Sequence, residues 1–277
     1  MKKIPIFDTH THLDLDSFDD DRDAVIRRTE IGIFPGGLLP EELDGFEIEM
    51  VGVLLPGIDA KSSRRCMELA GKSPIFHAAA ALHPNYTGQA TDADWQTILE
   101  LTQRNDIVAI GETGLDRYRD YTPFDVQVEF FHRHIRLAKE TDKPILIHNR
   151  DAWNDILPIL HNEKNLRGVI HAFSGNADQA KECIDLGWHI SFAGALTYRN
   201  TKFAGLWAAA KTVPIDRLLI ETDSPFLTPH PFRGKLPRNE PTMTAMVAHR
   251  LAELRQEPLE RIAEATTENA RKLFGGR

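Results

Sequence analysis

The sequence predicts a single-domain α/β fold, a (β/α)₈ barrel of the TIM type. The chain has 277 residues, a typical length for one such barrel. Short apolar runs alternate with longer amphipathic segments, and this alternation repeats eight times. An open doubly wound sheet is the alternative fold, but no GxGxxG phosphate-binding sequence follows the first strand. We therefore expect one domain over residues 1–277.

Each predicted strand is a short apolar run that ends in polar or turn-forming residues. In chain order these runs cover residues 4–10, 48–57, 75–84, 107–115, 144–150, 167–175, 188–195 and 217–225. The intervening amphipathic segments predict helices over 21–30, 63–71, 92–103, 125–140, 152–162, 176–187 and 202–211. Two more helices are predicted over 241–256, where Pro241 suits the first turn, and over 259–275.

Two stretches interrupt this pattern. Residues 31–47 are rich in Gly and Pro and predict an irregular loop. Because this loop follows a helix, we expect it on the barrel face opposite the active site. Residues 224–241 are rich in Pro and follow the last strand. Loops in that position build the active sites of barrel enzymes, so we expect this loop at the mouth.

The composition fits a folded domain with an acidic surface. Hydrophobic residues make up 42% and charged residues 27%, so a large core is expected. The net charge of −8 gives no overall attraction to nucleic acid, so phosphate binding must depend on local cations or metal. Cys66 and Cys183 lie in predicted helices and indicate buried thiols in a reducing compartment. The sequence shows no signal-peptide core or membrane-length apolar stretch, so we expect a cytoplasmic protein without membrane contacts.

Side chains of the kinds that bind metal gather at the ends of the predicted strands. The run FDTHTH places Asp8, His10 and His12 at alternating positions, which share one face of a strand. His, Glu or Asp also ends five later strands, as His83, Glu112, His148, His171 and the pair Glu221 and Asp223. The C-terminal ends of barrel strands converge at one mouth, so these residues should meet there.

These residue types suit two divalent metal ions. Imidazole nitrogens and carboxylate oxygens both bind such ions, and a carboxylate can bridge a pair. We predict one ion held by His10, His12, Glu112 and Asp223, and a second held by Glu112, His148 and His171. Such a centre can orient water and neutralise charge on a phosphodiester. Glu112 and Asp223 are the predicted catalytic carboxylates, and Asp223 could also orient or deprotonate the attacking water.

Any one of these histidines alone is better explained as a polar strand cap or a hydrogen-bonded core residue. Their joint placement on several strands is not explained in that way. The other histidines are predicted to be structural or solvated, namely His77, His132, His134, His161, His189 and His249. His230 lies in the mouth loop and is left undecided.

Arginine side chains near the mouth could bind phosphate, because guanidinium makes bidentate contacts with it. Arg150 follows His148 by two residues, and Arg238 lies in the loop 224–241. We predict that these two arginines bind substrate, together with His83 and Glu221. Solvated surface charge is the better interpretation for Arg117, Arg119 and Lys235.

The chain resembles the TatD family of metal-dependent deoxyribonucleases, within the wider amidohydrolase-like barrels. The resemblance lies in the motifs FDTHTHLD, AIGETGLD, PILIHNRDA, VIHAFSGN, LLIETDSPFLTP and RNEP, in that order, and runs from about residue 6 to residue 274. It implies a TIM barrel with a two-metal site whose ligands are His10, His12, Glu112, His148, His171 and Asp223. It further implies a substrate contact for His83, and cleavage of DNA with Mg²⁺, Mn²⁺ or Zn²⁺, in several members as exonucleases on single strands.

The resemblance leaves some questions open. The family usually has a short turn where this chain has residues 31–47. A hydrolase of a small phosphoester, lactone or cyclic amide would suit the acidic charge. However, Glu112 occupies the position at which many amidohydrolase barrels carry a carboxylated lysine. A non-catalytic metal-binding scaffold fits less well, because the ligand set is intact. We expect single-stranded DNA ends as substrate and a monomer, although the sequence does not determine the oligomeric state.

Overall fold

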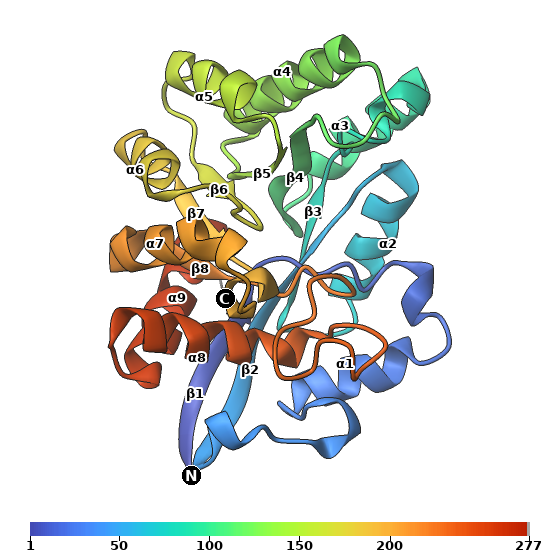
Figure 1. Ribbon diagram of the computed structural model, residues 1–277. Coiled ribbons are helices and arrows are strands. Elements are labelled where there is room, and N and C mark those ends of the chain that lie inside the picture. The colour runs from blue at the N-terminus through green and yellow to red at the C-terminus, as the bar shows by residue number, and fades with distance from the viewer. Residues whose placement is uncertain (276–277) are drawn as a thin grey trace.

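The computed structural model describes residues 1–275 and confirms the predicted barrel (Figure 1). Eight parallel strands are hydrogen-bonded in chain order: β1 (Lys2–Asp8), β2 (Phe46–Pro56), β3 (Phe76–Ala80), β4 (Ile107–Asp116), β5 (Ile145–Arg150), β6 (Gly168–Ile170), β7 (His189–Phe192) and β8 (Leu218–Ile220). The first and last strands meet just beyond their ends, where the N–H of Thr9 donates to the carbonyl of Ile220 at 3.1 Å.

The helices surround these strands and confirm the predicted segments, with small differences at their ends (Figure 1). They are α1 (Arg22–Glu30), α2 (Ala60–Ala70), α3 (Asp92–Thr102), α4 (Phe124–Thr141), α5 (Trp153–Asn162), α6 (Ala177–Asp185), α7 (Ala204–Thr212), α8 (Thr244–Arg255) and α9 (Leu259–Phe274). Pro241 opens a short 3₁₀ turn before α8. None of the helices within residues 1–275 is long and apolar enough to cross a membrane.

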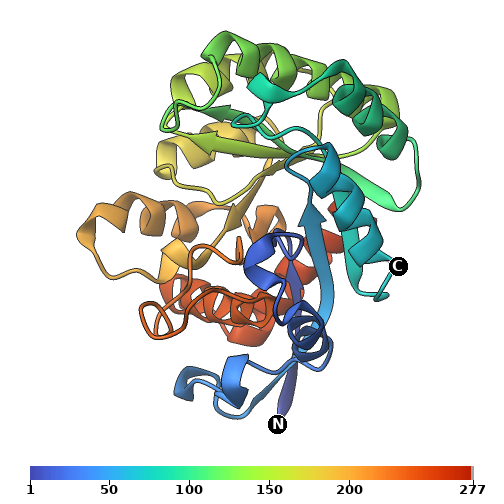
Figure 2. The same ribbon diagram turned by 90° about the vertical axis from the view of Figure 1, so that its right-hand side faces the viewer.

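A small apolar core fills the inside of the barrel, with Phe7, Leu54, Ala79, Ala109, Leu146, Val169 and Leu219 contributed by seven of the strands. The last turn of α9 closes the N-terminal end, because Leu273 and Phe274 join this core. The loop 224–241 and the end of α9 lie at opposite ends of the barrel (Figure 2). The C-terminal end is therefore the one available for polar side chains.

The segment between α1 and β2 does not stay on the face opposite the mouth, so our prediction for residues 31–47 was wrong. The segment buries Phe34 and Leu43. The Phe34 ring lies 5.6 Å from the ring of Phe232, which belongs to the loop 224–241. Phe34 and Leu43 can be buried only by packing on another apolar surface, because the irregular segment has no core of its own. The side of the barrel beside α8 provides this surface.

Candidate metal centre

The ligand residues that follow the first and last strands lie side by side. The N–H of His12 donates to the carbonyl of Ser224 at 2.8 Å, and the N–H of Asp223 donates to the carbonyl of His10 at 2.9 Å. The two segments therefore stay paired beyond β1 and β8. Asp223 has a φ of 55°, a left-handed conformation that Asp adopts more readily than most residues. This pairing brings Asp223 beside both histidines.

Asp8 fixes the same junction from below the ligands. Its carboxyl accepts hydrogen bonds from the N–H of Thr222 at 2.9 Å and from Thr222 Oγ1 at 2.6 Å. Burial raises the pKa of Asp8 to about 8. Asp8 has no exposed surface, so it supports the site without facing the mouth.

Glu112, in the second half of β4, places its carboxylate at the middle of the site. Its Oε2 lies 3.2 Å from His10 Nε2 and 3.6 Å from His12 Nε2. Its Oε1 lies 2.8 Å from both His148 Nδ1 and His171 Nε2. One carboxylate thus faces two pairs of imidazoles with its two oxygens, which is the arrangement expected of a bridging ligand.

Asp223 completes the group around His10 and His12. Its Oδ1 lies 3.5 Å from His12 Nε2 and 3.9 Å from His10 Nε2. The Asp223 side chain is 16% exposed, whereas that of Glu112 is only 4% exposed. Asp223 can therefore reach a molecule in the mouth, and Glu112 is enclosed by its partners.

The donor set fits divalent metal ions. Among residues 1–275, three groups bring one ligand atom from each member within 4.8 Å of the others: His10, His12 and Glu112; His10, His171 and Asp223; and His83, Glu112 and His148. The ion pairs of Glu112 and Asp223 with described residues involve only histidines. Buried carboxylates are normally paired with a cation or bound to metal, so this set suits a metal centre.

The same contacts set the protonation of the ligands. Burial alone would raise the pKa of Glu112, but the imidazoles of His171, His83 and His10 outweigh it and hold that pKa well below its usual range. Burial also opposes charge on His171, but Glu112 raises the pKa of this imidazole well above its usual value. For His10, burial dominates and lowers the pKa. Glu112 is therefore ionised at neutral pH, the form in which a carboxylate binds metal.

His83, predicted to contact substrate, lies against the ligand set. Its Nε2 is 3.3 Å from Glu112 Oε1, and its ring centroid is 4.5 Å from that of His148. The side chain is 10% exposed, less than that of His148 at 16%, and is thus as enclosed as the predicted ligands. His83 is placed beside the second predicted metal position, at the edge of the mouth.

Asp116, the last residue of β4, is a site residue that sequence analysis missed. Its Oδ2 lies 3.3 Å from His148 Nε2 and accepts a hydrogen bond from Asn85 Nδ2 at 3.0 Å. Burial alone would raise the pKa of Asp116. The hydrogen bonds from His148, the N–H of Arg119 and Asn85 outweigh burial and lower this pKa below its usual value. Asp116 therefore orients the His148 ring. Its even spacing from Glu112 on one strand was the available signal, since both side chains share a face.

Glu221 does not face the mouth, and our prediction that it binds substrate was wrong. Its side chain is fully buried. Its Oε1 accepts a hydrogen bond from the N–H of Ala172 at 2.7 Å and lies 3.2 Å from His171 Nδ1. Glu221 lies behind the His171 ring, so it is a positioning residue for that ligand.

The two arginines predicted to bind substrate have different surroundings. Arg150 is exposed, stacks on the Tyr118 ring at 4.0 Å, and forms no ion pair with residues 1–275. Arg238 donates to Asp21 and to the carbonyl of Ser17, and it is only 17% exposed. The predicted substrate contact of Arg238 was therefore wrong, because its guanidinium is already held inside the protein. Arg150 remains free for a substrate.

Residues interpreted as structural or solvated behave as predicted where their contacts are defined. The Arg117 guanidinium pairs with Asp155 at 2.6 Å on the surface. The N–H of Leu82 donates to His134 Nε2 at 3.1 Å, and burial lowers the pKa of His134 to about 4. His161 pairs with Glu182 on the surface at 2.7 Å. These histidines lie on helices, away from the mouth.

Comparison with known proteins gives the same picture. The family model described as TatD related DNase matches residues 7–275. An uncharacterized metal-dependent hydrolase of Bacillus subtilis, YabD, is 41% identical over 271 residues, which cover 97% of this chain and 98% of the relative. The uncharacterized metal-dependent hydrolase TatD of Mycobacterium tuberculosis is 36% identical over 277 residues and 97% of each chain.

Solved structures share the same barrel. YjjV, a TatD homologue from Escherichia coli, superposes with a TM-score of 0.84 at 29% identity over 98% of each chain. A TatD family hydrolase from Entamoeba histolytica has a TM-score of 0.82 at 19% identity over 100% of each chain, which supports the fold. The barrel, the histidine and carboxylate set at its mouth and these relatives place the chain in the TatD family of metal-dependent hydrolases.

Proposed function

We propose that this protein is a deoxyribonuclease that cleaves phosphodiesters at single-stranded DNA ends. The observation that carries the proposal is Glu112, whose two oxygens face His10 and His12 on one side and His148 and His171 on the other. When bound, two divalent ions (Mg²⁺, Mn²⁺ or Zn²⁺) would activate water and neutralise charge on a phosphate. The family description, TatD related DNase, supports DNA as the substrate class.

In this proposal the side chains at the mouth have separate roles. One ion would be held by His10, His12, Glu112 and Asp223, and the other would be held by Glu112, His148 and His171. Asp223 is the more exposed carboxylate, so it orients the attacking water and accepts its proton. His83 and Arg150 face the substrate, with His83 beside Glu112 and Arg150 free to contact a phosphate.

Exposed aromatic rings around the mouth favour a single strand as the substrate. Among residues 1–275, the large aromatic side chains that are exposed all follow the C-terminal ends of strands: Tyr86, Tyr118, Tyr121 and Phe226. The Phe226 ring lies 6.3 Å from the His12 ring, and the Tyr86 ring lies 6.0 Å from the His83 ring. Exposed rings beside a phosphate site stack on unpaired bases, whereas a duplex keeps its base faces covered.

A cytoplasmic location belongs to the same proposal. Cys66 and Cys183 are both free and buried, as expected for thiols in a reducing compartment. Fractionation of cells that produce the natural protein would test this location.

The test of function uses purified protein, labelled single- and double-stranded DNA, and a panel of divalent metals. We expect shortening of single strands with Mg²⁺ or Mn²⁺ and little attack on duplex interiors. EDTA should abolish the activity, as expected for a metal-dependent enzyme. The substitution His148→Ala should also abolish it, and that result would exclude a contaminating nuclease. The DNase proposal fails if the metal-loaded protein cleaves no DNA but hydrolyses a small phosphoester, lactone or cyclic amide.

A further inference from the structure

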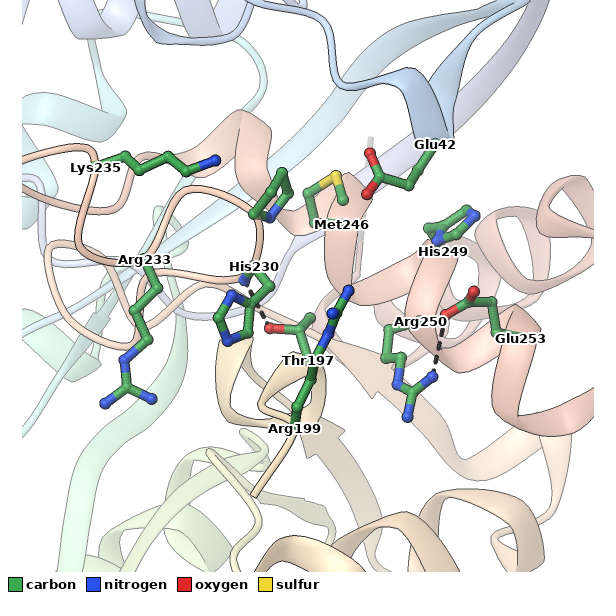
Figure 3. A pocket seen from close by; sticks show the side chains of 11 residues that line it. Glu42, Thr197, Arg199, His230, Arg233, Lys235, Met246, His249, Arg250 and Glu253 are labelled. Carbon is green, nitrogen blue, oxygen red and sulfur yellow. Dashed lines mark hydrogen bonds and ion pairs between the residues drawn. The ribbon is translucent and has the colours of Figure 1, made fainter. Parts of the chain in front are cut away.

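A cavity of about 500 Å³ lies beside the mouth and contains none of the metal ligands. It lies between α8, the loop 224–241 and the segment that follows β7 (Figure 3). Its walls carry four cations and two carboxylates: Arg199, Arg233, Lys235, Arg250, Glu42 and Glu253. The chain as a whole has a net charge of −8, so this excess of cations is a local feature.

Most of these cations have no carboxylate partner. Arg250 pairs with Glu253 at 3.1 Å. Arg199, Arg233 and Lys235 form no ion pair with any residue described in the structure, unlike many other arginines of this protein. Figure 3 shows the Arg199 side chain reaching between Thr197 and Arg250. The cavity therefore presents free cationic groups to a ligand.

The loop 224–241, which carries Arg233 and Lys235, is held in place. The N–H of His230 donates to Thr197 Oγ1 at 2.9 Å, a contact drawn in Figure 3. The buried ring of Phe232 packs on Phe34 from the segment that follows α1. The unexpected path of that segment thus supports one wall of the cavity, and Glu42 from the same segment lines it.

The loop 224–241 connects the cavity to the metal centre along the chain. The guanidinium of Arg233 stacks on the Tyr198 ring at 3.8 Å. The Tyr198 ring lies 6.0 Å from the ring of His230, which lines the cavity. The loop 224–241, which carries Arg233 and His230, starts directly after Asp223. A strand that leaves the metal centre along this loop would reach the unpaired cations of the cavity.

We propose that this cavity binds backbone phosphates of the strand whose scissile phosphate lies at the metal centre. The inference rests on the proposed function for the source of the phosphate. Guanidinium groups make bidentate contacts with phosphate, and the Lys235 ammonium adds a point charge. Glu42 opposes an anion here, so its removal should strengthen binding.

The test compares substrates that can and cannot reach the cavity. Arg199→Glu and Lys235→Glu are assayed on bis(p-nitrophenyl) phosphate and on single-stranded oligonucleotides of increasing length. The preference for long over short substrates should fall about tenfold for each reversal, the size expected when a charge-assisted hydrogen bond is lost. Glu42→Gln should increase this preference. The control is Lys164→Glu. Lys164 is exposed, forms no ion pair within residues 1–275, and lies between α5 and β6 at the other end of the barrel.

An unchanged length preference in Arg199→Glu and Lys235→Glu would overturn the inference, and so would an equal loss in Lys164→Glu. Binding of a labelled oligonucleotide to EDTA-treated protein separates this inference from the proposed function. Binding that depends on Arg199 and Lys235, together with no DNA cleavage by the metal-loaded protein, would support the cavity and reject the nuclease. Binding of inorganic tripolyphosphate without binding of the oligonucleotide would reject the strand as the ligand.

Discussion

At the scale of single residues, Asp223 combines ligand geometry with exposure to the mouth. Its Oδ1 lies 3.5 Å from His12 Nε2, and its side chain is 16% exposed. Asp223→Asn keeps the shape but removes the charge and most of the basicity. We expect kcat to fall about 10³-fold, the size of a general-base contribution, with the fold retained. Kinetics, thermal melting and metal analysis check this, and wild-type turnover at full metal content would remove Asp223 from the mechanism.

Substitution of Glu221 tests whether a side chain behind the predicted ligands controls metal affinity. It holds His171 Nδ1 at 3.2 Å from inside the barrel. Glu221→Gln should weaken metal binding about 10- to 100-fold, because the His171 ring loses its carboxylate partner. Titration calorimetry with Mn²⁺ measures this. Glu182→Gln removes a similar carboxylate from the surface residue His161 and should leave metal binding unaltered. Equal affinities in both variants would contradict the role of Glu221.

The candidate ligands could be selected from sequence because residue type and strand-end position coincide in them, and the structure brings these side chains together. Their burial depth could not be predicted, since it depends on partners distant in the chain. Glu221 looked like a mouth residue, but it accepts a hydrogen bond from the N–H of Ala172 deeper in the barrel. Arg238 looked like a phosphate ligand, but Asp21, far away in sequence, holds its guanidinium. Pairwise contacts of this kind leave no local pattern in the sequence.

At the scale of elements, His134 connects α4 to the end of β3. Its Nε2 accepts the N–H of Leu82, so its Nδ1–H donates to the carbonyl of Phe130 at 2.7 Å. Burial lowers the His134 pKa to about 4 from the usual 6.5. Between these values the unfolded chain binds a proton that the folded protein excludes. The free energy of unfolding should therefore fall as the pH falls from 6.5 to 4, by at most about 3 kcal/mol from this group.

Urea unfolding of wild type and His134→Gln at pH 7 and pH 4.5 checks this prediction. The variant should lose less stability on acidification than the wild type, because glutamine does not titrate. Burial also lowers the pKa of His189 to about 4, so part of the acid effect should remain in the variant. An identical pH dependence in both proteins would exclude His134 as a source of acid sensitivity.

Arg238 fixes the loop 224–241 to the segment that precedes α1. It donates to Asp21 and to the carbonyl of Ser17, and its guanidinium stacks on the Phe18 ring at 4.3 Å. Arg238→Ala should destabilise the protein by about 1–3 kcal/mol and make the loop more sensitive to protease. Arg261→Ala, which removes an exposed ion pair with Glu257, should do neither. If Arg238→Ala leaves the loop intact but weakens the salt dependence of DNA binding, the original prediction that Arg238 contacts phosphate would be supported.

The course of an irregular segment is harder to predict than the regular elements. The strands and helices follow from local periodicity and lie at the predicted places in the chain. Several strands end earlier than predicted, with β3 ending at Ala80, β6 at Ile170 and β8 at Ile220. The segment after α1 has no period, and its course depends on the packing of Phe34 against Phe232, almost two hundred residues later. The contribution of this segment to the cationic cavity could therefore not be predicted from the sequence. One wall of the cationic cavity thus comes from a helix-to-strand segment, which the order of elements would place on the face opposite the mouth.

At the scale of the whole molecule, charge is distributed in separate zones. The net charge of −8 repels a polyanion at long range. Arg199, Arg233 and Lys235, however, line the cavity beside the mouth, and Arg150 lies with the exposed aromatic rings around it. Binding of DNA should therefore depend on contacts made at close range, and association should be slow compared with electrostatically steered complexes.

Metal binding should stabilise the folded state. Glu112 and Asp223 are surrounded by imidazoles, and their ion pairs within residues 1–275 include no lysine or arginine. Metal bound only to the folded state adds about 2.7 kcal/mol at a concentration one hundred times the Kd. We expect Mn²⁺ to raise the melting temperature and EDTA to reverse the increase. Lys164→Glu should retain this increase, and His148→Ala, which removes one predicted ligand, should show less of it. An equal increase in His148→Ala would place the stabilising metal elsewhere, and no increase in the wild type would contradict a metal centre at this mouth.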